Sequence, residues 1–228
     1  MVSTVFGPER FERNYRKQSQ FYKYLSFGSG AFLIGIIVLL KLKTPVWLIC
    51  FSLACSRYFW NEHKRCLVLV WKARAGDRGE KKVADILREL LPKGWQLISN
   101  LETNNIGDID FLVSSPQNDN YALEVKAHQG IVCSNGKNFY RKVNGQNILF
   151  EKNILKQTMN EALAVRDGMN LKFVTPVLVF SRATVSFHDR KISGVHVLQA
   201  DELIEFLLKD YETKHITDES NGSEKDQT

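Results

Sequence analysis

The fold is decided by residues 107–126, which read GDIDFLVSSPQNDNYALEVK. Apolar residues recur through residues 108–113 and 121–127, and the turn-rich segment SSPQNDN lies between them at residues 114–120. Short apolar runs separated by Ser, Pro, Asn and Asp are typical of strands joined by a turn. The segment therefore predicts two successive strands of a meander.

Charged side chains on these strands are the main candidates for chemistry. Side chains alternate between the two faces of a strand, so Glu124 and Lys126 share one face. Asp110 shares its face with Asp108 and Leu112. If the two strands pair through the turn, the carboxylates of Asp110 and Glu124 converge with the ammonium group of Lys126.

This set of side chains matches the hydrolysis of a phosphodiester. The reaction requires neutralisation of charge on the phosphate and a hydroxide near neutral pH. Hard cations such as Mg²⁺ or Mn²⁺, held by one or two carboxylates and water, supply both. A lysine beside them can position the attacking water or stabilise developing negative charge. We therefore expect a metal-dependent hydrolytic site here.

Helical and extended patterns around this segment complete an α/β domain. An apolar stripe over residues 77–91, ended by Pro92 and Gly94, predicts an amphipathic helix. The other predicted elements are strands at residues 95–99, 173–180 and 195–198 and helices at residues 151–166 and 201–208. The predicted order is α-β-β-β-α-β-β-α. Residues 212–228 are polar and without apolar periodicity, which predicts a disordered tail.

Four short segments resemble the nuclease-related domain family, NERD, a branch of the PD-(D/E)xK nuclease superfamily. They are Gly79-Glu80, residues 107–111, residues 123–126 and Gln129-Gly130. The resemblance spans roughly residues 76–180 and implies a restriction-endonuclease-like fold, in which helices flank a mixed central sheet. We accordingly expect a nuclease domain over residues 72–211.

The same resemblance implies roles for single residues. Asp110 and Glu124 would bind the metal ion, and Lys126 would be the catalytic lysine. Glu80 would be the acidic residue of the first helix and a further metal ligand. Gln157 would be the polar residue that the family places on the helix after the strands. The family often has Asn-Pro before that glutamine, where this sequence has Asn-Ile.

Some of these residues also have purely structural explanations. Asp77 as N-cap and Glu80 three residues later would form a capping box that stabilises a helix start. Asp108 suits the turn that enters a strand. An isolated Glu-x-Lys on a strand, such as Glu124 with Lys126, is common and is usually a solvated edge.

A basic and aromatic stretch follows the candidate site. It contains Lys137, Phe139, Tyr140, Arg141, Lys142 and Lys152. Such a stretch could follow a phosphate backbone or stack an unpaired base. It could equally be an ordinary charged hairpin.

Positive charge is concentrated in the N-terminal third of the chain. Residues 1–71 carry 10 Lys and Arg against 3 Asp and Glu, whereas residues 72–211 carry 19 against 17 and residues 212–228 carry 2 against 5. Much of this excess flanks apolar segments, where basic residues serve membrane topology. The pI of about 9.1 is therefore only weak support for a nucleic-acid partner.

Two uncharged runs follow the basic segment at residues 1–23. They cover 17 residues at 24–40 and 13 residues at 44–56, and they predict a membrane anchor of one or two transmembrane helices within residues 24–60. The flanking basic residues predict that both ends face the cytoplasm, which would place the nuclease domain at the cytoplasmic face of the cell (inner) membrane. The alternative is a buried helical hairpin of a soluble domain.

The sequence thus favours a membrane-anchored, Mg²⁺-dependent nuclease that acts on DNA rather than RNA, with no small-molecule cofactor. The alternative is an inactive nucleic-acid-binding or protein-docking module tethered to the membrane. A structural membrane protein is a third reading, because Gly28, Gly30 and Gly35 would let helices pack closely in an oligomer.

The four cysteines have no zinc-ligand spacing and are expected to be free thiols.

Overall fold

The computed structural model describes residues 8–40, 46–103, 107–134 and 139–222. The chain divides into two units, Met1–Asp77 and Arg78–Thr228. Helix α2 (Val46–Leu87) contributes to both units. The capping box predicted at Asp77 and Glu80 is absent, because both residues lie inside this continuous helix rather than at its start.

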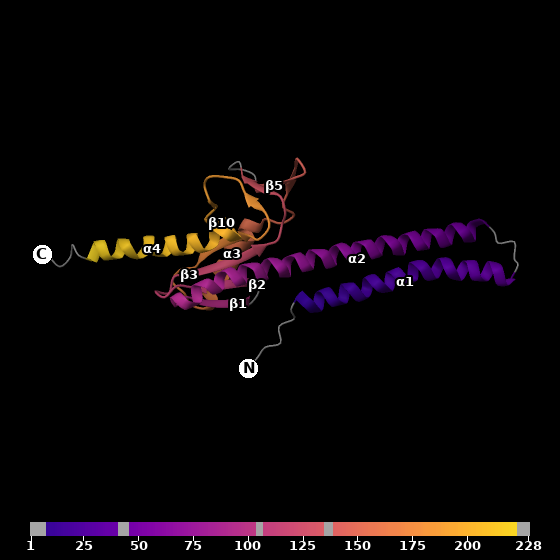
Figure 1. The fold of residues 1–228 in the computed structure, drawn as a ribbon, viewed down its shortest axis with the longest axis horizontal. Coiled ribbons are helices and arrows are strands. Elements are labelled where there is room, and N and C mark those ends of the chain that lie inside the picture. Colours follow the sequence, from indigo (N-terminus) through magenta and orange to yellow (C-terminus); the bar gives the residue numbers. More distant parts are fainter. Residues whose placement is uncertain (1–7, 41–45, 104–106, 135–138, 223–228) are drawn as a thin grey trace, which may run out of the picture. The chain divides into compact units, whose positions relative to one another are not determined.

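In the first unit, α1 (Pro8–Leu40) packs along the N-terminal part of α2 (Figure 1). Serine side chains connect the two helices. The Ser56 hydroxyl donates to the carbonyl of Ser26 at 2.9 Å, and the Ser52 hydroxyl donates to the carbonyl of Ser29 at 3.2 Å. Because serine is small, the helices can approach closely at these positions.

The predicted membrane anchor at residues 24–60 is not supported. None of the helices in the described part of the chain is long and apolar enough to cross a membrane. The second run, at residues 44–56, is 13 residues long, which is short for a span. The side chains of Leu33, Ile34 and residues 36–40, which are the most apolar part of the predicted span, lie outside the described residues.

The second unit is built on a mixed sheet with the strand order β1-β2-β3-β7-β10-β9 in the described part of the chain. The strands are β1 (Gln96–Thr103), β2 (Gly107–Ser114), β3 (Asn120–Lys126), β7 (Thr175–Phe180), β10 (Val195–Gln199) and β9 (Lys191–Ile192). The first three form an antiparallel meander, and β3 pairs with β7, and β7 with β10, in parallel. The five predicted strands are confirmed as β1, β2, β3, β7 and β10, whereas β9 was not predicted.

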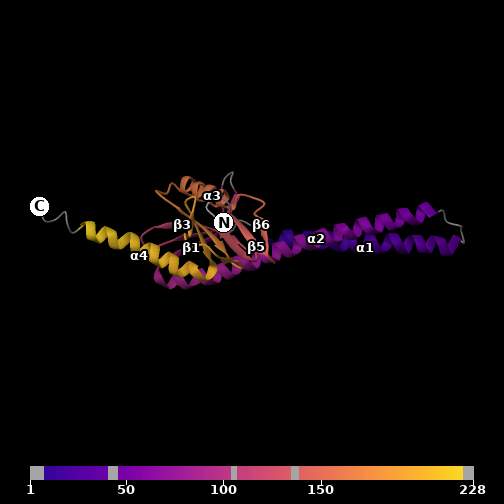
Figure 2. The same cartoon turned by 90° about the horizontal axis from the view of Figure 1, so that it is seen from above.

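Helices cover both faces of this sheet (Figure 2). On one face, Ala162 and Val165 of α3 (Ile154–Gly168) pack against Leu112 and Ala122. The opposite face is covered by the end of α2 and by α4 (Leu203–Gly222). The hydrophobic core on this opposite face includes Val83, Leu87, Phe111, Leu123, Val125, Leu203 and Leu207.

A second, smaller sheet was not predicted. Its described strands run in the order β6-β5-β4-β8, namely β6 (Gln146–Leu149), β5 (Phe139–Val143), β4 (Ile131–Ser134) and β8 (Thr184–Val185). Val132 and Val185 pack with Phe180 of β7 in a shared core. Phe139, Tyr140, Arg141 and Lys142 of the basic and aromatic stretch lie in β5, which forms a hairpin with β6. Lys152 follows β6, and Lys137 lies outside the described residues.

The remaining helical segments are short, except for α4. The 3₁₀ segments η1 (Arg88–Lys93) and η2 (Ala200–Glu202) precede β1 and α4. Gly94 ends η1 with a left-handed φ of 83°. Helix α4 continues to Gly222, beyond the end predicted at residue 208, so residues 212–222 of the predicted tail are helical.

Candidate active site

The candidate site forms where β2 and β3 separate. Backbone pairing runs from Ser114 and Asn120 to Phe111 and Leu123, which is the last described pair. One residue further, the carboxylate of Asp110 accepts a hydrogen bond at 2.7 Å from the backbone N–H of Val125. A side chain thus replaces the strand partner at this point, which brings the Asp110 carboxylate next to β3.

Glu124 and Lys126 lie on the same face of β3, as predicted. The ammonium group of Lys126 forms an ion pair with Oε1 of Glu124. The Glu124 residue is only 5% exposed, so this carboxylate has little contact with water. The pair is therefore held in a poorly solvated place, where its charges interact more strongly than at the surface.

Helix α3 adds two side chains to the same cluster. The amide nitrogen of Gln157 donates to Oε1 of Glu124 at 3.1 Å and to Oε1 of Glu161 at 2.8 Å. Asn153 caps the helix by accepting the backbone N–H of Lys156 at 3.0 Å. The cap fixes the start of α3 and so aims Gln157 and Glu161, one turn apart, at β3.

Glu80 approaches the cluster from α2. Its negative charge helps to raise the pKa of Asp110, so the two carboxylates interact through space. The preceding Gly79 makes this approach feasible, since a Cβ added there would lie 2.5 Å from Oγ of Ser181 and 3.1 Å from Cβ of Ala127. The helix can lie this close to the ends of β3 and β7 only where there is no side chain.

Residues 75–181 match the family model of NERD, the nuclease-related domain. The NERD segment contains all five predicted site residues, Glu80, Asp110, Glu124, Lys126 and Gln157. Its limits agree with the span over which the sequence resembles this family.

A solved structure also shows similarity, at a low level. It is the crystal structure of a repair endonuclease from Pyrococcus abyssi, with 14% sequence identity and a TM-score of 0.30. The match covers 55% of this chain and 42% of the endonuclease chain, so less than half of that protein is represented. No curated protein matches the sequence.

The carboxylates of the NERD segment repel one another. Burial and the negative charge of Glu124 raise the pKa of Asp110, although the Val125 N–H and Lys126 oppose the shift. Burial and Glu124 likewise raise the pKa of Glu161, against the hydrogen bond from Gln157. The cluster is therefore short of positive charge and would bind a proton or a cation.

One buried oxygen supports the fit of a cation. Oε2 of Glu161 is buried and has no hydrogen-bond partner among the described residues. Carboxylate oxygens are the ligands that hard cations prefer. Within the described residues, no group of three or more His, Cys, Asp or Glu side chains is arranged to hold a metal ion. The predicted metal ligands Asp110, Glu124 and Glu80 therefore do not form such a group. Mg²⁺ is often held by one or two carboxylates with several waters, and Asp110 and Glu124 are the two carboxylates that could hold it here.

Glu161 is the site residue that sequence reasoning missed. It is 3% exposed and points with Gln157 at Glu124. The sequence signal that could have identified Glu161 is its position four residues after Gln157, which places both side chains on the same face of a helix. Asp108, by contrast, is exposed at the start of β2, which agrees with a role at the strand entrance.

Proposed function

We propose that this protein is a divalent-metal-dependent nuclease that hydrolyses phosphodiester bonds of DNA. The observation that carries the proposal is the cluster of Asp110, Glu124 and Lys126 where β2 and β3 separate. Its position inside the NERD segment supports the same conclusion. Two carboxylates and one lysine in a poorly solvated site suit the cleavage of a charged ester.

Asp110 and Glu124 would hold a Mg²⁺ or Mn²⁺ ion from the two separated strands. Such an ion neutralises charge on the phosphate and lowers the pKa of a water molecule. Lys126 would orient the attacking water and stabilise negative charge as it develops on the phosphate oxygens. Gln157 would fix the Glu124 carboxylate through its hydrogen bond, and Glu161 would complete the acidic side of the cluster.

The test is a cleavage assay of the full chain on linear, circular and single-stranded DNA and on RNA, in Mg²⁺, Mn²⁺ or EDTA. Glu124→Gln keeps the size of the side chain and its acceptor oxygen but removes the charge. We expect cleavage only with metal, and a loss of about 10²–10⁴-fold in rate in Glu124→Gln and in Lys126→Ala.

Matched controls are Glu205→Gln and Lys209→Ala, which make the same changes at exposed positions of α4. Both should cleave like the unchanged protein. DNA binding without cleavage by a folded chain, indifferent to metal, would identify an inactive binding module and contradict the proposal. Cleavage of RNA alone would contradict the choice of substrate.

A further inference from the structure

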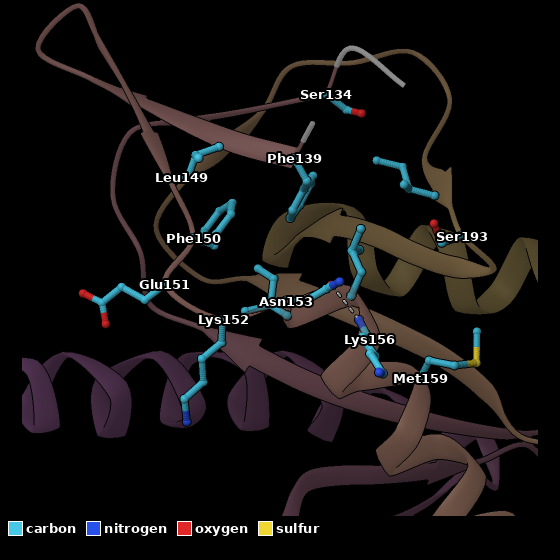
Figure 3. Close-up of a pocket in the computed structure, with 13 residues that line it drawn as sticks. Ser134, Phe139, Leu149, Phe150, Glu151, Lys152, Asn153, Lys156, Met159 and Ser193 are labelled. Carbon is cyan, nitrogen blue, oxygen red and sulfur yellow. Dashed lines mark hydrogen bonds between the residues drawn. The ribbon is translucent and has the colours of Figure 1, made fainter. Parts of the chain in front are cut away.

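A pocket of about 540 Å³ opens beside the start of α3 (Figure 3). Its apolar wall comes from Phe139 and Leu149 of the second sheet, from Phe150, which follows β6, and from Met159 of α3 and Ile192 of β9. Figure 3 shows the phenylalanine rings on one side and the residues of α3 on the other. The volume is within the range of pockets that bind small organic groups, about 300–1,000 Å³.

The wall is aromatic and aliphatic, and its phenylalanine rings also contact one another and Phe180. The Phe139 and Phe150 rings stack with centroids 5.1 Å apart and planes 22° from parallel. Both residues remain partly exposed, and Leu149 beside them is 69% exposed. The partly exposed rings and Leu149 together give an apolar surface on which a planar base can pack, and such packing needs no particular hydrogen-bonding pattern.

Two lysines lie at the edge of this pocket. Lys152 and Lys156 are exposed, and within the described residues neither takes part in an ion pair. Between them, Asn153 caps α3, whose N-terminal dipole adds to the positive potential. Among the described residues that line the pocket, Glu151 is the one acidic side chain, so the two lysines leave a positive balance. This edge is complementary to phosphate groups.

The lysines also connect the pocket to the candidate active site. A second pocket of about 350 Å³ is lined by Lys152, Asn153, Lys156, Gln157 and Asn160. Gln157 donates a hydrogen bond to Glu124 at 3.1 Å. The path from the apolar pocket to the carboxylates thus follows about one helical turn of α3, which rises about 5.4 Å.

We propose that the apolar pocket receives the base of an unpaired nucleotide, while Lys152 and Lys156 hold the phosphates that link this nucleotide to the scissile bond. The substrate is then single-stranded DNA or a DNA duplex with an unpaired end. A base inside a duplex is covered by its neighbours on both faces and cannot enter such a pocket. The proposal rests on the proposed nuclease function and names the form of its substrate.

The first test measures binding of the full chain in EDTA, so that neither metal nor cleavage contributes. A labelled single-stranded oligonucleotide is compared with a blunt duplex of the same length by fluorescence anisotropy over a range of salt. We expect tighter binding of the single strand. In the Lys152→Ala, Lys156→Ala double variant, the slope of log Kobs against log salt should be smaller by about 1.4, for two lost phosphate contacts.

The matched control is the double variant Lys172→Ala, Lys209→Ala, which removes the same charge at exposed positions outside both pockets. It should keep the slope of the unchanged protein. Equal affinity for single strand and blunt duplex would overturn the proposal, as would the same slope in the two double variants. Neither result bears on metal-dependent cleavage, which the Glu124→Gln variant tests separately.

A second test places 2-aminopurine near the end of the single strand. Its fluorescence should fall on binding, because the base stacks in the pocket, and Leu149→Glu should abolish the fall and weaken binding about 5- to 100-fold. Leu149 is 69% exposed, so this change should not unfold the chain. Phe173→Glu, at a residue 63% exposed outside both pockets, is the control. An unchanged fluorescence on binding would overturn the placement of the base.

Discussion

The carboxylate of Glu161 has two oxygens in different situations. Oε1 accepts a hydrogen bond from Gln157 at 2.8 Å, whereas Oε2 is buried without a partner among the described residues. A buried acceptor without a partner costs about 1–3 kcal/mol of stability. The ionised form of Glu161 bears this cost, whereas its protonated form can donate a hydrogen bond to Glu124. The group lies beside the candidate catalytic residues, where unsatisfied groups are expected to serve function.

The pH dependence of stability should report on this carboxylate. Burial and the charge of Glu124 raise the pKa of Glu161 to about 7. An acid whose pKa is higher in the folded state stabilises the fold at low pH and loses that contribution as the pH rises from about 4.3 through the folded value. In EDTA, chemical denaturation should therefore show that Glu161→Gln loses less stability than the unchanged protein between pH 5 and 8, by about 2–3 kcal/mol.

Glu205→Gln is the control for this measurement, since Glu205 is exposed on α4. Its pH profile should match that of the unchanged protein. If the stability of Glu161→Gln and that of the unchanged protein change equally with pH, ionisation of Glu161 does not destabilise the fold. The argument that the cluster is short of positive charge would then fail.

The sequence predicted the strand residues of this site better than the helical ones. Asp110, Glu124 and Lys126 lie on two neighbouring strands, and period-2 alternation sufficed to bring them to one face. Gln157 was placed through a family resemblance, and Glu161 was missed. A helix presents several polar residues to its surroundings, and only the tertiary packing of α3 decides that Glu161 is buried.

Helix α2 meets the main sheet of the second unit at Gly79. An alanine in a helix is normally more stable than glycine, by about 1 kcal/mol. Here the added Cβ would lie 3.1 Å from Cβ of Ala127, which cannot move aside as a flexible side chain could. Gly79→Ala should therefore destabilise the protein by about 1–3 kcal/mol and reduce cleavage, because Glu80 is displaced. Thermal denaturation and the cleavage assay measure the two effects.

Gly168→Ala is the matched control, because no atom lies within 4 Å of a Cβ added at that helical position. It should be neutral or slightly stabilising. Ser181→Ala removes the hydroxyl that would lie 2.5 Å from the new Cβ, so it should partly restore stability in combination with Gly79→Ala. Equal stability of Gly79→Ala and Gly168→Ala would show that α2 can accommodate a Cβ at residue 79, which would contradict this prediction.

Some elements could be predicted and others could not, for physical reasons. Strand β7 is buried at all six residues and appears as a continuous apolar run. By contrast, β6 is exposed at all four residues, and β8 and β9 have two residues each, so none has a recognisable period. The second sheet depends on the core shared with Phe180, which involves residues distant in sequence.

All candidate site residues and both pockets belong to the unit Arg78–Thr228. A fragment of residues 72–228 should therefore fold and cleave short oligonucleotides with a kcat/KM within about threefold of the full chain, because a compact unit with its own core can fold alone. Circular dichroism and the cleavage assay check the two parts of this prediction.

A fragment of residues 92–228 is the informative comparison. It lacks Val83, Leu87 and Leu90, which are buried in the core beneath the sheet, and it also lacks Glu80. Removal of three large or medium apolar side chains from a core exceeds what a domain of this size tolerates, so this fragment should not fold. Loss of activity in the folded 72–228 fragment would instead show that the first unit contributes to the reaction.

The hydrogen bond from Val125 to Asp110 makes one backbone amide a reporter of the site. Its N–H is held by a carboxylate rather than by a neighbouring strand, at 2.7 Å. Proton or cation binding at Asp110 changes the charge of that acceptor, and the amide resonance of Val125 would shift with it. A nuclear magnetic resonance titration could thus follow occupancy of the cluster at a main-chain atom, without any substitution in the chain.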